Sequence, residues 1–230
     1  MNKKIVFLIP SSSLNCFFTN IETCSLISQT YNSLAKFDKI KDYTFLIGFD
    51  DDDSFYTQNK DNLINILPSN FKLHYLNNFN KTYVCIVNQL ANIAINEYGA
   101  DYLFLIADDL EFYSLDCIDD FISWFGDKNY GLCHSRDKTN LADICTHPFV
   151  SSNHVKTLGY FYPNEIKNWY SDTWITQLYN NLGLVYKTQD YILRNTILDK
   201  RYTIHKICPS KFKKYVGESQ KIIEEKINEI

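Results

Sequence analysis

The sequence predicts an α/β protein with a mixed, mainly parallel central sheet flanked by helices. Three observations lead to this fold class. Short apolar runs alternate with segments of helical periodicity in the first half of the chain. The apolar runs are continuous, which is typical of strands that are buried on both faces. Two of them end in groups of carboxylates, at the place where open α/β sheets usually bind ligands.

Four apolar runs in the first half of the chain are predicted strands. They cover residues 4–10, 43–49, 72–76 and 101–107. A further strand is expected near residues 130–135, where the sequence reads "YGLCHS". The later segments "YILRN" and "RYTIHKI" also have strand-like composition.

Helices are predicted between these strands. In residues 20–36 apolar side chains recur at helical spacing, and Thr19 with Glu22 forms an expected capping box. Residues 81–98 show the clearest amphipathic pattern, with one apolar face and one polar face. Further helices are predicted over residues 57–67, 116–126 and 171–183, and as an amphipathic tail at the C-terminus.

Composition limits the class of protein. The 230 residues suit a single domain, and the hydrophobic share of 45% is enough for a core. The net charge of −4 gives no electrostatic reason to expect nucleic acid or an anionic membrane as partner. No stretch approaches the roughly 20 apolar residues of a membrane span, so we expect a cytoplasmic protein without an integral membrane segment.

The seven cysteines are scattered, odd in number and without a C-x-x-C pair. This spacing favours neither a disulfide framework nor a zinc site, and it indicates a reducing compartment. The apolar run at the N-terminus has five residues, which is too short for a secretory signal.

Carboxylates gather after two of the predicted strands. Residues 50–53 are all aspartate, and Asp108, Asp109 and Glu111 follow the fourth strand. Clustered carboxylates repel one another unless a cation lies between them, and Mg²⁺ or Mn²⁺ is the cation that suits oxygen ligands. Aspartates can instead simply cap a turn. Their place at the end of a buried strand favours a metal–diphosphate site.

Several nucleotide-binding and catalytic motifs are absent. The sequence has no G-x-x-x-x-G-K-[ST], no G-x-G-x-x-G and no G-x-S-x-G. The loop after the first strand, "IPSSSLNCFF", contains neither glycine nor aspartate. Its composition disfavours nucleotidyltransferases with a glycine-rich loop, and also phosphatases with an aspartate nucleophile. A site that binds a diphosphate through a metal remains.

Two long segments resemble the GT-A fold glycosyltransferases that use nucleotide sugars, a GT2-like superfamily. The segment "KTYVCIVNQLANIAINEYGADYLFLIADDLEF" resembles their donor-binding helix, strand and acidic motif, and "HPFVSSNHVKTLGYFYPNEIKNWYSDTWI" resembles their acceptor side. The resemblance implies a single Rossmann-like GT-A domain over residues 1–230. Its nucleotide-sugar-binding half would cover about residues 1–111, and its acceptor half about 112–230.

The resemblance implies a metal site at the acidic motif. The family's D-x-D pattern falls on residues 106–108, where Ile106 replaces the first aspartate. Asp108 is then the expected ligand of Mn²⁺ or Mg²⁺ and of the donor, with Asp109 or Glu111 assisting. His205 resembles a C-terminal histidine that completes the metal shell in many members, although a lone histidine in a strand is more often a packed or surface residue.

The resemblance also implies donor contacts. Pro10 and Ser11 match the loop that lies along the nucleoside, and Asp50 matches the position that contacts the base or the ribose. On the polar face of the helix at residues 81–98, Lys81 and Asn88 are candidates for a stripe that faces the ligand. A solvated polar stripe is the alternative for that face.

On the acceptor side, Asp172 resembles the general base of inverting members. The alternative is that Asp172 only caps its helix. The aromatic side chains of Trp169, Tyr170 and Trp174 suit stacking against a sugar ring, although tryptophan and tyrosine are often core residues.

The predicted activity is metal-dependent, inverting transfer of a sugar from a UDP-sugar to a hydroxyl of a glycan or protein. A degenerate GT-A domain that binds nucleotide or glycan without turnover is one alternative, because the first aspartate is missing. A sugar nucleotidyltransferase is the other. The amphipathic tail could support a homo-oligomer, or it could pack within the same chain.

Overall fold

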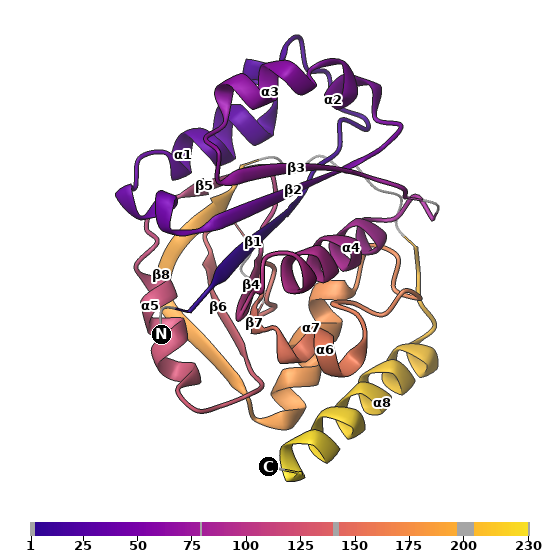
Figure 1. Cartoon of the computed structure of the whole chain (residues 1–230). Coiled ribbons are helices and arrows are strands. Elements are labelled where there is room, and N and C mark those ends of the chain that lie inside the picture. Colours follow the sequence, from indigo (N-terminus) through magenta and orange to yellow (C-terminus); the bar gives the residue numbers. More distant parts are fainter. Residues whose placement is uncertain (1–2, 79, 140–142, 197–204, 230) are drawn as a thin grey trace.

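One mixed sheet forms the centre of the molecule (Figure 1). The computed structural model describes residues 3–78, 80–139, 143–196 and 205–229. Over these described residues the sheet has eight strands, in the order β3-β2-β1-β4-β7-β6-β8-β5. Their bounds are β1 (Ile5–Pro10), β2 (Thr44–Asp50), β3 (Phe71–Leu76), β4 (Tyr102–Leu105), β5 (Leu110–Phe112), β6 (Leu132–Asp137), β7 (Phe149–Ser151) and β8 (Val185–Asn195).

The strands β1 to β4 all run in one direction. β1 pairs in parallel with β2 and β4, and β2 pairs in parallel with β3. β7 is antiparallel to both β4 and β6, so β6 again runs with β4, and β8 is parallel to β6. The carboxyl ends of six strands therefore lie along one edge of the sheet, and the predicted fold class is confirmed.

Helical segments connect the strands. They are η1 (Ile21–Thr23), η2 (Leu26–Tyr31), α1 (Asn32–Leu34), η3 (Asp38–Asp42), α2 (Ser54–Gln58), α3 (Lys60–Ile66), α4 (Tyr83–Asn96), α5 (Cys117–Phe125), α6 (Asn153–Leu158), α7 (Ser171–Leu182) and α8 (Pro209–Asn228). η1 and η3 are 3₁₀ helices, and η2 is a π-helix.

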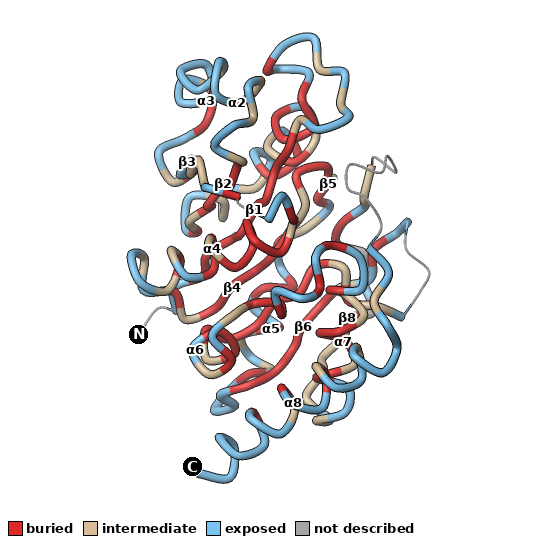
Figure 2. Tube along the Cα trace, turned by 90° about the vertical axis from the view of Figure 1, so that its right-hand side faces the viewer, coloured by how far each residue is buried: buried red, intermediate tan, exposed pale blue. Residues whose placement is uncertain are grey.

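Both faces of the sheet are covered, which explains why the strands lack polar alternation. In β1 the side chains of Ile5, Phe7 and Ile9 enter one core, and those of Val6 and Leu8 enter the other. The first core is closed by η2, α1, α2, α3 and α5, and the second by α4, α6, α7 and α8. Figure 2 shows the resulting band of buried residues through the centre of the molecule.

The first helical region differs from the prediction. Residues 20–36 form a 3₁₀ turn, a π-helix and a short α-helix instead of one regular helix. The predicted capping box of Thr19 and Glu22 is wrong by one residue, because Asn20 is the N-cap. The Asn20 side chain accepts from the Thr23 N–H at 3.0 Å, and Thr23 Oγ1 accepts from the Asn20 N–H at 3.3 Å.

The strands also differ from the prediction in several places. Within the described residues, β3 is the strand at one edge of the sheet, and it is only half-buried along most of its length. β5 and β7 were not predicted, since three residues carry too little pattern. In the predicted strand "RYTIHKI", residues 201–204 lie outside the described part of the chain, and residues 205–207 are irregular.

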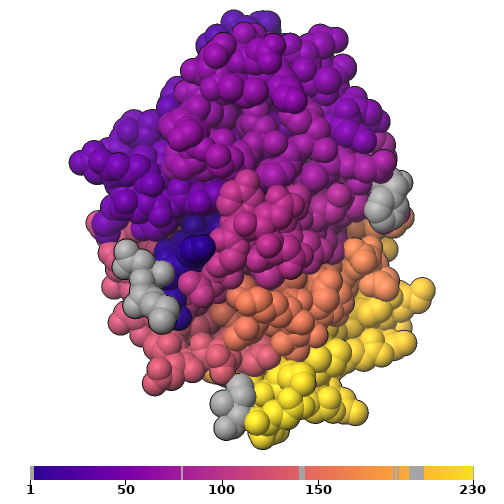
Figure 3. Space-filling view, in the orientation of Figure 1, coloured from indigo at the N-terminus to yellow at the C-terminus, as the bar shows by residue number. Residues whose placement is uncertain are grey.

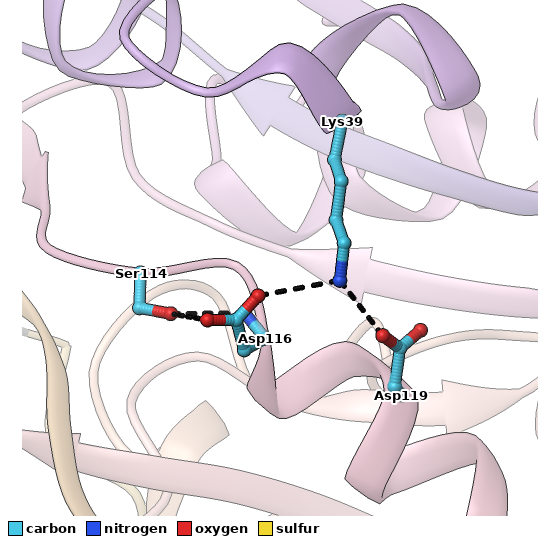
Figure 4. A network of polar contacts seen from close by, with 4 residues as sticks. All are labelled: Lys39, Ser114, Asp116 and Asp119. Atoms are coloured by element: carbon cyan, nitrogen blue, oxygen red, sulfur yellow. Dashed lines mark hydrogen bonds and ion pairs between the residues drawn. The ribbon is translucent and has the colours of Figure 1, made fainter.

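A surface ion pair joins η3 to the start of α5 (Figure 4). The Lys39 ammonium lies 3.2 Å from Asp116 and 2.7 Å from Asp119, and these carboxylates raise the pKa of the lysine. Asp116 also accepts from the Ser114 hydroxyl at 3.1 Å. The groups are well exposed, so their contribution to stability is small.

The C-terminal amphipathic segment packs within the chain. It forms α8, which lies against α6 and α7 at the lower right of Figure 3. Val216, Ser219 and Ile223 are buried in this contact, while Ile222 and Ile227 remain partly exposed. Within the described ranges, no helix is both long and apolar enough to cross a membrane. All seven cysteines are free thiols.

Candidate functional site

The carboxyl edge of the sheet gathers most of the predicted site residues. β1, β2 and β4 all end there, because they are parallel. α4 leads into β4 and α7 leads into β8, so both helices run back along the sheet and begin at this same edge. The acidic segments after β2 and β4 are therefore brought together with the first turns of α4 and α7.

Ser11 and Asp108 meet directly at this edge. The Ser11 hydroxyl donates to Asp108 Oδ2 at 2.5 Å and lies 2.9 Å from the Tyr56 hydroxyl. Both Ser11 and Asp108 are almost fully buried. The loop after β1 and the acidic end of β4 are thus held together by a short, charge-assisted hydrogen bond. The sequence pairs these residues only through the resemblance, and it contains no signal for Tyr56.

Asp50 is linked to the start of α4. Its Oδ1 accepts from the Asn78 side chain at 2.7 Å, and Asn78 also accepts from the Thr82 N–H at 3.0 Å. Thr82 is the N-cap of α4 and accepts from the Cys85 N–H. Burial raises the pKa of Asp50, and the Asn78 hydrogen bond opposes the shift. Asn78 is not predicted from the sequence, because it lies in an asparagine-rich loop to which no spacing rule applies.

Lys81 lies beside this group and pairs with a different aspartate. Its ammonium is 2.5 Å from Asp52, and both side chains are largely exposed. The Lys81 backbone has a φ of 49°, a left-handed conformation that is uncommon for a residue with a side chain. This cation is at the rim of the carboxyl edge, next to the N-terminus of α4.

Asn88 is part of the protein's internal framework. Its Oδ1 accepts from the N–H groups of both Phe161 and Tyr162 at 2.9 Å. Its Nδ2 donates to the Tyr162 carbonyl at 2.8 Å and to Asn164 at 3.0 Å. The predicted donor-binding role of Asn88 is therefore corrected to a structural one, because its amide is buried and fully engaged with the segment before α7.

Replacing Asn88 with alanine is expected to destabilise the fold by about 2–4 kcal/mol, because it leaves buried backbone groups of Phe161 and Tyr162 unpaired. The free energy of unfolding from urea titration measures this. Asn92→Ala, at an exposed position of the same helix, is the matched control and should change it by less than about 0.5 kcal/mol. Equal stability of the two variants would contradict the structural role.

The arrangement of carboxylate, imidazole and thiol side chains determines where a metal ion could bind. Within the described residues, no three His, Cys, Asp or Glu side chains lie close enough together to hold an ion. His205 is exposed in the irregular segment before α8. Asp108 and Asp109 are adjacent in the turn after β4 and mostly buried. Two carboxylates fit Mg²⁺ or Mn²⁺ when the ion takes its other ligands from phosphate and water.

Asp172 lies in the first turn of α7. Tyr170 occupies the N-cap position without a side-chain cap, so Asp172 is not the cap of this helix. Its carboxyl group is partly buried, and burial raises its pKa to about 7. The Ser171 hydroxyl, in a long hydrogen bond of 3.5 Å to this carboxyl group, acts against the rise in pKa. No described cation pairs with it. A carboxyl group with a pKa near neutral is suited to proton transfer.

Two of the three predicted acceptor aromatics face solvent. Trp169 is 45% and Tyr170 41% exposed, and both lie just before Asp172. The Tyr170 ring also contacts Phe212 of α8 edge-on. Trp174 is completely buried against Tyr162 and its neighbours, so its predicted role in stacking against a sugar is wrong. Helical spacing turns Trp174 toward the core.

Hydrogen bonds fix the position of the segment before α7 relative to α4. The Tyr83 N–H donates to the Asn168 side chain at 2.7 Å, and the Asn168 carbonyl accepts from the Ser171 hydroxyl at 2.9 Å. The Val84 N–H donates to the carbonyl of Lys167 at 3.2 Å. The start of α7, with Asp172, is therefore held against the start of α4.

Solved structures share this architecture. The chain aligns with residues 1–349 of S. aureus TarS in complex with UDP-GlcNAc at a TM-score of 0.62 and 14% identity, covering 94% of this chain and 66% of TarS 1–349. It aligns with a mannosyltransferase of Pyrobaculum calidifontis, in complex with GDP-Man and Mn²⁺, at a TM-score of 0.61 and 10% identity, covering 84% of this chain and 57% of that one. The chain has the GT-A fold.

The similarity to these GT-A proteins is structural. No family model matches the chain, and no curated protein matches it in sequence. Against a second structure of TarS 1–349 the TM-score is 0.58 at 15% identity, with 84% of this chain and 60% of the other covered. The chain covers 37% of a longer TarS structure. This GT-A chain therefore spans well under two thirds of the length of that longer protein.

Proposed function

We propose that this GT-A protein is a glycosyltransferase that moves a sugar from a nucleoside-diphosphate sugar to a hydroxyl acceptor. A UDP-sugar is the first donor to test, and a glycan or protein is the expected acceptor. The proposal is supported by one observation above the others. Asp172, with its pKa near 7, lies in the first turn of α7, and this helix begins at the sheet edge that carries Asp108 and Asp109.

The chemistry follows from the expected roles of the residues. Asp172 takes the proton of the acceptor hydroxyl while the hydroxyl oxygen attacks the anomeric carbon, and the bond from that carbon to the diphosphate breaks. Attack from the side opposite the diphosphate inverts the configuration. Trp169 and Tyr170 offer exposed rings for the acceptor sugar.

The donor would lie along the strand ends. Pro10 and Ser11 follow the nucleoside, and Asp50, fixed by Asn78, accepts hydrogen bonds from the base or ribose. Lys81, which pairs with Asp52 at the rim, would meet the negative charge of the donor there. Asp108 and Asp109 would hold Mn²⁺ or Mg²⁺, which when bound offsets the charge of the leaving diphosphate. In this proposal His205 has no assigned role, because it is exposed outside any strand.

Calorimetric titration of UDP, with and without Mn²⁺, tests donor binding, and release of UDP from UDP-sugars tests turnover. Binding that needs Mn²⁺, followed by sugar-dependent UDP release, is the expected result. GDP and CDP serve as comparison nucleotides. If none of the three nucleotides binds with or without metal, the proposal is wrong.

Two alternative functions give different outcomes in the same assays. A degenerate GT-A domain, suggested by the buried Ile106 in place of an aspartate, would bind nucleotide and never release UDP. A sugar nucleotidyltransferase would release pyrophosphate from UTP and a sugar phosphate. The glycine-free loop after β1, held to Asp53 through Ser13, favours the transferase over the latter.

A further inference from the structure

The turn that carries Asp108 and Asp109 is supported by hydroxyl groups of two adjoining helical segments, η2 and α1. We call residues 107–112 the acidic turn. Thr30 Oγ1 accepts from the Leu110 N–H at 2.9 Å, and Ser33 Oγ accepts from the Phe112 N–H at 3.1 Å. The Ser33 hydroxyl also lies 3.3 Å from the Leu110 carbonyl. Two side chains thus accept hydrogen bonds from the N–H groups of alternate residues, Leu110 and Phe112.

A third hydroxyl supports the acidic turn from the other side. Thr196, just after β8, donates to the Asp109 carbonyl from its N–H at 3.0 Å and from its hydroxyl at 2.7 Å. β5 and β8 also pair, with Glu111 opposite Arg194 and their charged groups 2.7 Å apart. The peptide unit that joins Asp109 to Leu110 is therefore held at both its carbonyl oxygen and its N–H.

Thr30 reaches the acidic turn from an unusual helix. It lies in the π-helix η2, whose wider turn is a feature often found near functional sites. In a regular helix a threonine hydroxyl commonly bonds to its own helix. The Ser33 hydroxyl does lie 3.0 Å from the Thr30 carbonyl, whereas Thr30 Oγ1 is taken by Leu110. Both side chains are almost fully buried.

We propose that Thr30 and Ser33 are positioning residues for the acidic turn. They fix the backbone from which Asp108 and Asp109 present their carboxylates to the metal and the diphosphate. This inference rests on the proposed function. A purely structural role would affect the stability of the fold alone, whereas misplacement of ligands by about 1 Å costs roughly 100-fold in function.

The test compares the variants Thr30→Val, Thr30→Ser and Ser33→Ala with the wild type. UDP binding is measured by calorimetry over a range of Mn²⁺ concentrations. The temperature is one at which circular dichroism shows each variant to be folded. Thr30→Val keeps the side-chain volume and removes the hydroxyl. We expect it to weaken Mn²⁺-dependent UDP binding at least about tenfold and to raise the Mn²⁺ concentration that is required. Thr30→Ser should restore binding to within about threefold.

Thr176→Val is the matched control. Thr176 is another buried threonine that bridges backbone groups, accepting from the Cys145 N–H at 2.9 Å and donating to the Asp172 carbonyl at 2.6 Å. It lies in α7, outside the acidic turn. We expect this variant to lose thermal stability as Thr30→Val does, without a change in UDP affinity or Mn²⁺ requirement.

Three outcomes decide between the hypotheses. If wild type binds UDP and folded Thr30→Val binds it equally well at the same Mn²⁺ concentration, the positioning role is wrong while the proposed function stands. If wild type binds no nucleotide, the proposed function and this inference both fail. If Thr30→Val does not fold, Ser33→Ala decides, and its unchanged UDP binding would also refute the inference.

Discussion

Asp172→Asn is expected to reduce the rate of sugar transfer by about 100- to 10,000-fold while leaving UDP affinity unchanged, because it removes the proton acceptor and preserves the shape of the side chain. Transfer is measured as UDP release with acceptor present, and binding by calorimetry. Glu165→Gln, an exposed carboxylate in the segment before α7, is the matched control and should leave both unchanged.

The pH dependence of transfer should follow the same carboxyl group. A general base works when ionised, so kcat/KM of the wild type is expected to rise about tenfold per pH unit below pH 7 and to level off above it. Loss of this limb in the residual activity of Asp172→Asn would support the assignment. Normal turnover in Asp172→Asn would remove Asp172 as the base and point to a retaining mechanism.

Stability gives an independent check on Asp172. Its pKa is raised from 3.8 to about 7 in the folded state, so the native protein holds this proton to higher pH than the unfolded chain does. The wild type must therefore lose stability as the pH rises from about 4 to 7. Asp172→Asn lacks that loss and should be more stable than the wild type at pH 8 by roughly 1–3 kcal/mol, measured by urea denaturation.

Asp108→Ala is expected to abolish Mn²⁺-dependent UDP binding, with a loss of affinity of at least about 100-fold. This loss is larger than that expected when a residue that only supports a metal ligand is changed. Asp108 joins the acidic turn to the loop after β1 by accepting a hydrogen bond from the Ser11 hydroxyl. Calorimetry at saturating Mn²⁺ measures the loss.

Two further variants separate the possible causes of that loss. Ser11→Ala removes the hydrogen bond and keeps the carboxylate, and should weaken binding by about tenfold. Asp119→Ala removes an exposed carboxylate that contacts Lys39 (Figure 4) and should have no effect on binding. If Ser11→Ala is as damaging as Asp108→Ala, the aspartate acts as an anchor for the loop. Full Mn²⁺-dependent binding in Asp108→Ala would show that another group holds the metal.

The predicted strands are found where local pattern is strong. β1, β2 and β4 are continuous apolar runs buried on both faces, so the continuity and short length of each run reveal them. β5 and β7 have three residues each and exist only because neighbouring strands pair with them. The irregular helix over residues 21–34 has an apolar pattern close to that of a regular helix, and its π-turn could not be predicted from spacing.

The positions of several candidate site residues could also be predicted where the local pattern is strong. Asp50, Asp108 and Asp172 stand at the ends of elements that the pattern or the resemblance identifies, so their place at the carboxyl edge followed from topology. Asn88 and Trp174 were assigned to ligands because a polar stripe and an aromatic cluster look alike in sequence whether they face solvent or the core. Their actual neighbours, Tyr162 among them, come from a different part of the chain.

The sequence by itself determined the α/β class, the mainly parallel order of the first strands and the acidic character of one sheet edge, because these depend on periodicity and on residues adjacent in the chain. Only the tertiary structure decided that Ser11 meets Asp108 and that Thr30 and Ser33 hold the acidic turn. Periodicity tells which side chains share a face of an element. What that face meets is set by contacts between segments some 70 to 100 residues apart, and no local pattern records them.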